Sequence, residues 1–176
     1  MTSDRTTAEN TWPDALYDVL RNHGYRYFTY VPDSGHQHLI ERAHEDPDAV
    51  AIPLSNEGEG VGIAAGCHLG GGKAVLLTQS GGIGNCVNYF SLTQHCALPL
   101  LCIVTMRGDW GEQNPWQYPM GRAVEPVLAA MRIDTMRVAD PGEVVATASA
   151  AAGAVDRAGR AVAILLTQRL LGVKKF

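Results

Sequence analysis

The sequence predicts an α/β fold, a single doubly wound domain with a mainly parallel sheet of about six strands. Short apolar segments alternate with helix-forming segments along the chain, which is typical of parallel strands covered on both faces. The chain has 176 residues, of which 46% are hydrophobic, enough for one core without disulfides or metal. We expect the domain to span residues 11–170, between a polar tail at 1–10 and a short tail at 171–176.

Six segments have the apolar, β-branched or aromatic composition of buried strands. In chain order they are 25–31, 50–54, 74–78, 100–105, 133–138 and 161–166. Pro32 and the residues after it break the first of these strands. The length of the whole chain suits one domain, so no second domain is expected.

Helix signals lie between these strands. Thr11 and Pro13 supply a cap and a first-turn proline for a helix that ends near Gly24. Ser34 can cap a second helix, which runs to about Glu45. Further helices are expected from residue 57, after residue 84 and over the alanine-rich stretch 141–158. With about six helices, the pattern completes one doubly wound domain.

Two connections differ from the short turns of such folds. Residues 80–85 form a glycine-rich loop after a strand, and residues 106–119 form a long loop with two tryptophans. Long loops at strand ends tend to carry function. Because parallel strands end at one edge of the sheet, we expect these loops, the turn at 32–34 and Glu57 to converge on one site.

Composition excludes several classes of partner. A net charge of -4 with 18% charged residues argues against nucleic acid and against an anionic membrane surface. Since no apolar run reaches membrane-spanning length and the start lacks a secretory signal, we expect a cytoplasmic protein. The four cysteines have no metal-ligand spacing and are interpreted as buried small hydrophobic residues. No complete metal site is expected on this chain.

Glu57 is the most informative single residue. It lies where a strand-like segment ends and a helix rich in glycine and alanine begins. In open α/β sheets this edge is where ligands bind. The helix dipole alone also favours an acidic first turn, so position by itself leaves a purely structural role open. The small residues of the helix predict that another backbone packs closely on it.

Nucleotide binding is disfavoured by the glycine patterns. Closely spaced glycines at 81–84 could offer backbone N–H groups to a phosphate. However, Lys73 is followed by Ala74 rather than by Ser or Thr, and the dinucleotide fingerprint is absent from the first strand–helix turn.

Histidine and arginine side chains add candidates at the same edge. His36 and His38 diverge on a helix and are interpreted as ordinary surface histidines, with His36 the better candidate for a site residue. Arg107 and Arg122 bracket the aromatic loop. The planar fork of Arg suits carboxylate, phosphonate or sulfonate groups, and a structural salt bridge is an equal alternative.

Five motifs occur in order along the chain. They are V-P-D-S at 31–34, the segment 56–66 that begins N-E-G, Q-S-G-G-I-G-N at 79–85, R-G at 107–108 and P-M-G-R at 119–122. Together they resemble the pyrimidine-binding part of thiamine-diphosphate-dependent 2-oxo-acid decarboxylases, over roughly residues 13–170. The nearest likeness is to the phosphonopyruvate and sulfopyruvate decarboxylase branches. The resemblance implies a flavodoxin-like, thiamine-diphosphate-binding fold.

The resemblance also implies roles for individual residues. Glu57 would hydrogen-bond a ring nitrogen of the aminopyrimidine and favour the imino tautomer that generates the reactive ylid. The candidate catalytic residues are Glu57, Ser34 and His36. The candidate cofactor-binding residues are Glu57, Pro32, Gly82, Ile83 and Asn85. The candidate substrate-binding residues are Asp33, Arg107, Gln117 and Arg122.

A part of the expected active site is missing from this chain. Full-length enzymes of this class hold the diphosphate through Mg²⁺ with a Gly-Asp-Gly motif followed by Asn, which this chain lacks. We therefore expect thiamine diphosphate to bind across an α–β interface, with Mg²⁺ ligated by a separate, diphosphate-binding beta subunit. The small-residue surface of the Glu57 helix and the loop carrying Trp110 and Trp116 are the candidate contacts.

The expected function is decarboxylation of an anionic 3-substituted pyruvate, of the sulfopyruvate or phosphonopyruvate type. The segment 115–122 looks closer to the sulfopyruvate branch, whereas 31–34 looks closer to the phosphonopyruvate branch. Ser80–Gly81 and Gly35–His36 depart from the family pattern. An acyloin-forming carboligase or another 2-oxo-acid lyase on the same scaffold is therefore one alternative. A noncatalytic, flavodoxin-like assembly module is another.

Overall fold

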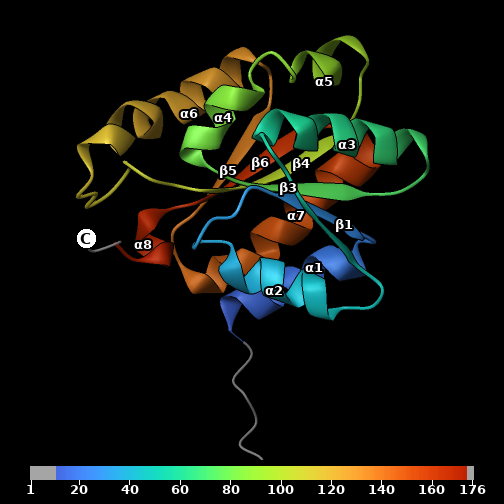
Figure 1. Cartoon of the computed structure of the whole chain (residues 1–176), viewed down its shortest axis with the longest axis horizontal. Coiled ribbons are helices and arrows are strands. Elements are labelled where there is room, and N and C mark those ends of the chain that lie inside the picture. Colours follow the sequence, from blue (N-terminus) through green and yellow to red (C-terminus); the bar gives the residue numbers. More distant parts are fainter. Residues whose placement is uncertain (1–10, 174–176) are drawn as a thin grey trace, which may run out of the picture.

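The sheet of the computed structural model, which describes residues 11–173, has six parallel strands in the order β2-β1-β3-β4-β6-β5 (Figure 1). The strands are Tyr27–Tyr30 (β1), Val50–Pro53 (β2), Ala74–Gln79 (β3), Leu100–Thr105 (β4), Asp134–Val138 (β5) and Ala161–Leu166 (β6). The predicted α/β, doubly wound fold is confirmed, and each strand lies within or next to its predicted segment.

Helices cover both faces of the sheet. They are Trp12–Asn22 (α1), Gln37–Glu45 (α2), Glu57–Leu69 (α3), Ser80–Cys86 (α4), Ser91–His95 (α5), Tyr118–Ala130 (α6), Val144–Ala158 (α7) and Gln168–Leu171 (α8). Figure 1 shows α1, α2 and α7 on one face and α3, α4, α5 and α6 on the other.

Successive residues of β3 belong to the two cores in turn, as the pleat requires. Val75 and Leu77 pack with Phe28 in the core beneath α1, α2 and α7. Leu76 packs with Ile83 in the core beneath α3, α4 and α6. Since both faces are covered, the central strands β3, β4 and β6 are continuous apolar runs rather than alternating ones.

The strand order indicates where the candidate site lies. β1 pairs with β2 on one side and with β3 on the other, so the direction of winding reverses between β1 and β3. The crevice at the carboxyl ends of such strands is the usual ligand site of open α/β sheets. The turn after β1, the start of α4 after β3 and the loop after β4 all begin at this edge.

Two elements differ from the sequence-based expectation. The glycine-rich segment expected as a loop is helix α4, because its glycines let it lie close against α3 and α6. The expected long loop is shorter, because α6 begins at Tyr118 and was not predicted. Its signals are Pro119 in the first turn and the fully buried pair Val124 and Leu128, whereas Pro126 obscures the helical pattern.

Two other expectations can be compared with the structure, and a third concerns residues that lie mostly outside the described range. Cys86 and Cys102 are buried as expected and Cys67 is half-buried, but Cys96 is exposed, so the interpretation of all four as buried was wrong. Across residues 11–173, no helix is both long and apolar enough to cross a membrane. The expected tail at 1–10 and the last residues of the tail at 171–176 lie outside the described residues.

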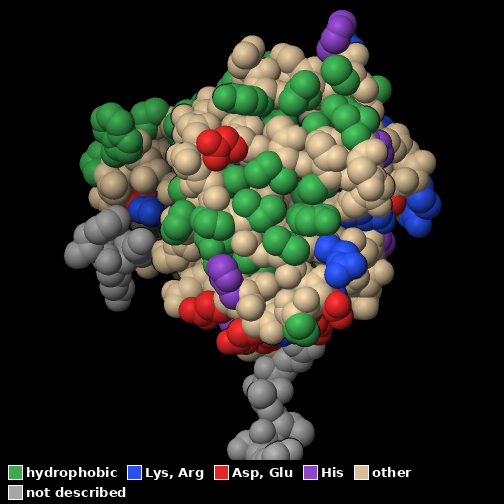
Figure 2. Space-filling view, turned by 45° about the vertical axis from the view of Figure 1, so that its right-hand side comes forward, with side chains coloured by type: hydrophobic (Ala, Val, Ile, Leu, Met, Phe, Trp, Pro, Cys, Tyr) green, Lys and Arg blue, Asp and Glu red, His purple; other side chains and the backbone are tan. Residues whose placement is uncertain are grey.

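The outer edge of the sheet leaves apolar surface in contact with solvent. β2 is an edge strand, and its Val50 is 45% exposed. Figure 2, in which the right-hand side of Figure 1 comes forward, shows hydrophobic side chains gathered in the centre of this face and acidic side chains along its lower border. Such a distribution, apolar in the middle and charged at the rim, is typical of surfaces that bind a partner.

Candidate active site

Glu57 begins α3 at the carboxyl edge of the sheet. The side chain of Asn56 caps this helix, since its Oδ1 accepts a hydrogen bond from the backbone N of Gly58 at 2.9 Å. The Glu57 side chain is nearly buried, with 8% exposed. Its Oε2 accepts a hydrogen bond from Nδ2 of Asn85 on α4, at 2.8 Å. The structure thus brings two of the predicted site residues into contact.

Gly82 of α4 lies directly against the Glu57 carboxylate. A Cβ atom on Gly82 would lie 2.5 Å from Oε1 of Glu57 and would overlap Oγ1 of Thr78. Only glycine therefore lets α4 approach the carboxylate so closely. This contact, rather than a phosphate-binding loop, explains why the segment is rich in glycine.

The glycines of α3 fall into two groups. A Cβ atom on Gly58 would overlap the ring of Tyr89, and one on Gly60 would lie 2.6 Å from Cδ1 of Leu76. At Gly62 and Gly66, by contrast, a Cβ atom would have no atom of another described element within 4 Å. The expected close contact of another backbone with this helix was therefore wrong within the described residues: side chains pack on its inner face at Gly58 and Gly60, and its outer face is open.

The turn after β1 rests on the end of β4. Oδ2 of Asp33 accepts hydrogen bonds from Oγ1 of Thr105 at 2.8 Å and from the backbone N of Gly35 at 3.1 Å. A Cβ atom on Gly35 would lie 2.7 Å from Cγ2 of Thr105, so glycine is required for this crossing. Pro32 and Ser34 are exposed at the same turn.

His36 is completely buried, so its interpretation as a surface histidine was wrong. Its Nε2 donates to the carbonyl oxygen of Thr78 at 2.9 Å, and because that oxygen only accepts, Nε2 carries the proton of the neutral ring. Burial lowers the pKa of His36. His38 is half-exposed, and its Nε2 lies 2.8 Å from Oδ1 of Asp14, as the surface interpretation expects.

Glu112, which the sequence analysis did not single out, organises the loop after β4. Its buried carboxylate forms a bidentate ion pair with Arg107, with Nε–Oε2 and Nη2–Oε1 distances of 2.7 and 2.8 Å. The pairing with Arg107 lowers the pKa of Glu112 to about 2. The interpretation of Arg107 as a salt-bridge residue is therefore confirmed.

The Glu112 carboxylate also accepts hydrogen bonds from the rest of its loop and from α8. The donors are the backbone N–H groups of Gly108, Gln113 and Asn114 and Nε2 of Gln168. Oε1 of Gln168 in turn accepts from the backbone N–H groups of Asp109 and Trp110. Because Gln168 follows the last strand, no local sequence pattern links it to this loop.

The R-G and P-M-G-R motifs meet through their backbones. Gly108 has a φ of +77°, and a Cβ atom on it would overlap the carbonyl oxygen of Gln117. A Cβ atom on Gly121 would overlap the carbonyl oxygen of Arg107. The glycines of these motifs therefore allow the loop to lie against the start of α6. Gln117 is half-buried in this contact, and Arg122 is exposed on α6.

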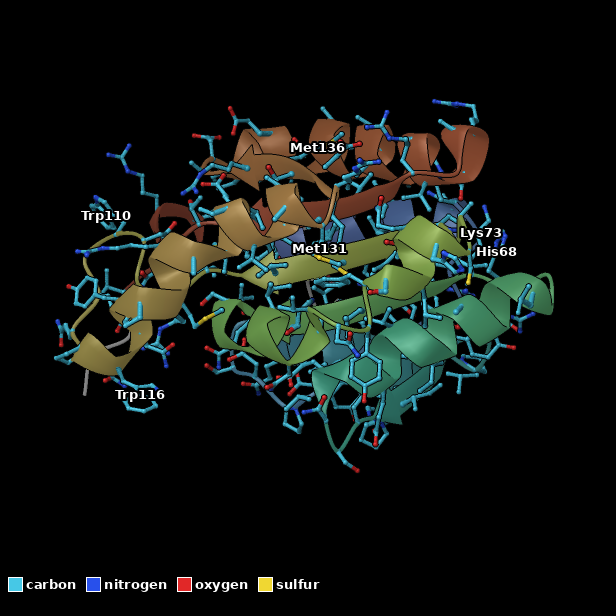
Figure 3. The ribbon with its side chains drawn as sticks, turned by 90° about the horizontal axis from the view of Figure 1, so that it is seen from above. His68, Lys73, Trp110, Trp116, Met131 and Met136 are labelled. Atoms are coloured by element: carbon cyan, nitrogen blue, oxygen red, sulfur yellow. The ribbon has the colours of Figure 1, made fainter. Side chains whose placement is uncertain are left out.

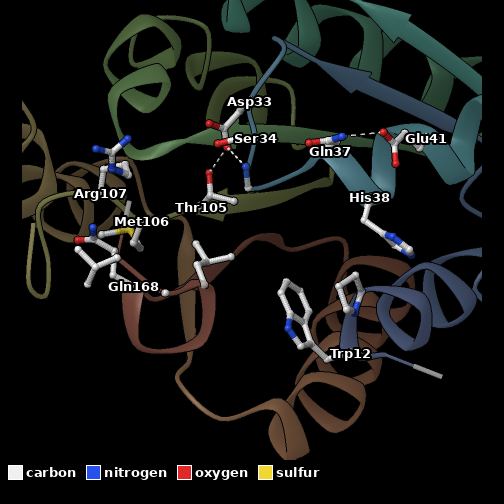
Figure 4. A pocket seen from close by; sticks show the side chains of 15 residues that line it. Trp12, Asp33, Ser34, Gln37, His38, Glu41, Thr105, Met106, Arg107 and Gln168 are labelled. Atoms are coloured by element: carbon white, nitrogen blue, oxygen red, sulfur yellow. Dashed lines mark hydrogen bonds between the residues drawn. The ribbon is translucent and has the colours of Figure 1, made fainter. Parts of the chain in front are cut away.

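A pocket of about 550 Å³ opens beside the turn after β1 and the end of β4 (Figure 4). It brings together Asp33, Ser34 and Arg107 of the predicted site residues, with Gln168 also in its wall. Arg107 lines the pocket while Glu112 fixes the orientation of its guanidinium group. The other predicted residues do not line this pocket: Pro32, His36, Glu57, Gly82, Ile83, Asn85, Gln117 and Arg122.

The loop after β4 presents aromatic surface at the site end of the molecule. Figure 3 shows Trp110 and Trp116 together at one end, opposite His68 and Lys73. Trp116 is 85% exposed and Trp110 is 49% exposed. Large exposed aromatic side chains at one end are typical of protein contact surfaces.

Comparison with known proteins places these features in a family. Residues 10–120 match the family described as thiamine pyrophosphate enzyme, N-terminal TPP binding domain. The chain is 37% identical over 130 residues to the sulfopyruvate decarboxylase subunit alpha of Methanocaldococcus jannaschii, covering 73% of this chain and 77% of that protein. It is 35% identical over 123 residues to the phosphonopyruvate decarboxylase of Streptomyces viridochromogenes, covering 69% of this chain.

The chain spans 31% of the length of that phosphonopyruvate decarboxylase. Among solved structures, it is similar to a chain of the 2-oxoglutarate:ferredoxin oxidoreductase from Magnetococcus marinus, with a TM-score of 0.74 and 13% identity. That similarity covers 92% of this chain and 29% of the other, and at this identity it establishes the fold alone.

Proposed function

The chain belongs to the thiamine pyrophosphate enzymes, as an N-terminal TPP-binding domain, and we propose that it is the alpha subunit of a heteromeric, thiamine-diphosphate-dependent decarboxylase. Its proposed substrate is an anionic 3-substituted pyruvate of the sulfopyruvate or phosphonopyruvate type. The observation that carries the proposal is the nearly buried Glu57 carboxylate at the carboxyl edge of the sheet, held by Asn85 and lying against Gly82.

The residues around Glu57 suit an aminopyrimidine ring. A carboxylate that is 8% exposed can share a proton with a ring nitrogen with little competition from water. Gly82 leaves the carboxylate uncrowded, whereas any side chain there would displace it. When bound, thiamine diphosphate supplies the carbanion stabilisation that loss of carbon dioxide from a 2-oxo acid requires. Glu57 would donate a proton to the ring nitrogen and take it back, and Pro32, Gly82 and Ile83 are the proposed cofactor contacts.

The pocket supplies the proposed substrate contacts. Ser34 is exposed at its wall, and Asp33 is fixed there by Thr105. Arg107 is held in place by Glu112, so its guanidinium group keeps one orientation toward this region. We restrict the proposed substrate contacts to these residues, since Gln117 and Arg122 lie outside the pocket. His36, which is fully buried, is proposed as a structural residue beneath the site rather than as a catalytic one.

The proposed partner is a beta subunit that holds the diphosphate through Mg²⁺. The relative from Methanocaldococcus jannaschii is named a subunit alpha, which supports an assembly of unlike subunits. The open outer face of α3 at Gly62 and Gly66 and the exposed Trp116 are the proposed contact surfaces. The cofactor would then bind between the two chains.

Carbon dioxide release tests this proposal. The substrates are sulfopyruvate, phosphonopyruvate and pyruvate, offered to this chain alone and with the product of a neighbouring gene, in thiamine diphosphate and Mg²⁺. We expect release only from the two-subunit complex, and faster release from the anionic 3-substituted acids than from pyruvate. An assembled, cofactor-loaded complex that releases no carbon dioxide from any of them would overturn the proposal. A new C–C bond on addition of an aldehyde would favour a carboligase.

A further inference from the structure

Asn85 on α4 is in contact with Glu57 on α3, and these two residues differ greatly in exposure. Asn85 is exposed on α4, whereas the Glu57 side chain at the start of α3 is 8% exposed. The 2.8 Å hydrogen bond from Nδ2 of Asn85 to Oε2 of Glu57 therefore joins a surface amide to a nearly buried carboxylate. Such charge-assisted hydrogen bonds are about twice as strong as those between neutral groups.

The helix that carries Asn85 is itself firmly held. At its first residue, Oγ of Ser80 accepts from the backbone N of Arg107 at 3.1 Å, and Ser80 is completely buried. Further along α4, Ile83 and Cys86 are both completely buried in the core. The amide of Asn85 is thus presented to Glu57 from a rigid support rather than from a loop.

The two oxygens of Glu57 have different surroundings on α4. Oε2 accepts a hydrogen bond from Asn85, while Oε1 lies so close to Gly82 that a Cβ atom there would approach it to 2.5 Å. The hydrogen bond fixes the direction of Oε2, and the backbone of α4 at Gly82 limits the movement of Oε1. The pair therefore restricts the carboxylate to one orientation.

We propose that Asn85 is a positioning residue for the reaction, acting through Glu57. This inference rests on the proposed function and deepens it. Asn85 holds one oxygen of the carboxylate so that the other is directed at the ring nitrogen of the cofactor.

Two substitutions at Asn85 and one matched control test the proposal. Asn85→Ala removes the donor, and Asn85→Asp replaces it with a like charge; Asn88→Ala changes another exposed asparagine three residues away. We expect Asn85→Ala to lower kcat about 10-fold, the effect of losing one hydrogen bond to a charged group. The KM for the 2-oxo acid should change little, because Asn85 does not line the pocket proposed for the substrate.

Cofactor affinity provides a readout that does not need turnover. Titration of the assembled complex with thiamine diphosphate, followed by calorimetry, should show weaker binding by at least about threefold in both Asn85 variants. Asn88→Ala should match the wild type in kcat and in cofactor affinity. Because Asn85 is exposed and packs in no core, both variants should fold and assemble with the partner, which circular dichroism and gel filtration check, so that positioning is separated from misfolding.

Two results would overturn the inference. One is an unchanged kcat and an unchanged cofactor affinity in both Asn85 variants. The other is tighter cofactor binding, which would mean that the amide merely occupies the place of the ring. A wild-type complex that binds thiamine diphosphate but releases no carbon dioxide would refute the proposed function alone, and the affinities of the Asn85 variants would still decide the inference.

Discussion

Glu112 and Arg107 form a bidentate ion pair, with distances of 2.7 and 2.8 Å, in the loop that follows β4. The side chain of Glu112 is completely buried, and Arg107 lines the pocket beside the end of β4. One carboxylate thus neutralises the arginine and accepts hydrogen bonds from its own loop and from Gln168. We infer that this ion pair, rather than the loop's own secondary structure, keeps the pocket wall in place.

Glu112→Gln should destabilise the domain by about 3 kcal/mol at pH 7, the usual cost of removing one partner of a buried ion pair. The difference in unfolding free energy between Glu112→Gln and the wild type should decrease as the pH falls. The pKa of Glu112 is lowered from 4.5 to about 2, so the unfolded chain takes up the proton first as the pH falls. Its stabilisation is therefore complete above pH 4.5 and disappears between pH 4.5 and about 2.

Denaturant unfolding at several pH values measures this difference. Glu125→Gln is the control, because Glu125 pairs with Arg137 but is 44% exposed, and exposed pairs contribute little. A Glu112→Gln variant as stable as the wild type at pH 7 would show that the ion pair does not hold the loop.

His36 should make the domain less stable as the pH falls below about 6.5. Burial lowers the pKa of His36 in the folded state, so the unfolded chain is protonated at this residue first. The unfolding free energy should therefore decline between pH 6.5 and pH 5, and His36→Gln should reduce that slope. His95→Gln, a change at an exposed histidine, serves as the comparison. Equal slopes of the unfolding free energy against pH in the wild type, His36→Gln and His95→Gln would show that His36 does not cause the loss of stability.

Gly82→Ala should disturb the site, whereas Gly84→Ala on the same helix should not. The new methyl group at 82 would lie 2.5 Å from Oε1 of Glu57, so the carboxylate must move; at 84 it would lie 3.4 Å from the flexible end of Met120. We expect Gly82→Ala to cost about 1–3 kcal/mol of stability. Carbon dioxide release by the Gly82→Ala complex should also fall, because the Glu57 carboxylate must move. Comparable activity and melting temperature in the two variants would mean that the close approach is not needed.

Trp116→Ala should weaken assembly without changing the fold. Trp116 is 85% exposed, so its loss removes no core packing, but truncation of a central interface tryptophan commonly costs 2 kcal/mol or more. Titration with the beta subunit should therefore show roughly 30-fold weaker binding, at an unchanged melting temperature. Val145→Ala changes an exposed apolar residue on α7, on the other face of the sheet, and should bind normally. Normal affinity in Trp116→Ala would place the interface elsewhere.

The central strands could be predicted from the sequence because β3, β4 and β6 are continuous apolar runs buried on both faces. β3 shows the reason, since Leu76 and Leu77 lie in opposite cores and both must be apolar. Glu57 was also identifiable, because its position at a strand–helix junction is a local pattern. The parallel strands then brought it to the expected edge of the sheet.

Other features could not be predicted, because they depend on contacts that no local sequence pattern indicates. Glu112 meets Gln168 from 56 residues away, so neither stood out in the sequence. The glycines of α4 resemble a loop in sequence, yet Gly82 is needed for close helix packing on Glu57. His36 is polar and follows a turn, which suggested the surface, but its hydrogen bond to Thr78 allows it to be buried.

The most direct test of the account is the rate of carbon dioxide release by the Glu57→Gln complex in saturating thiamine diphosphate and Mg²⁺. Glu59→Gln is the matched control, since Glu59 is an exposed acid in the same first helical turn and shares any helix-dipole effect. We predict that Glu57→Gln assembles with its partner but releases carbon dioxide at least about 100-fold more slowly, while Glu59→Gln keeps the wild-type rate. Equal rates in Glu57→Gln and wild type would contradict the role of Glu57 in the reaction.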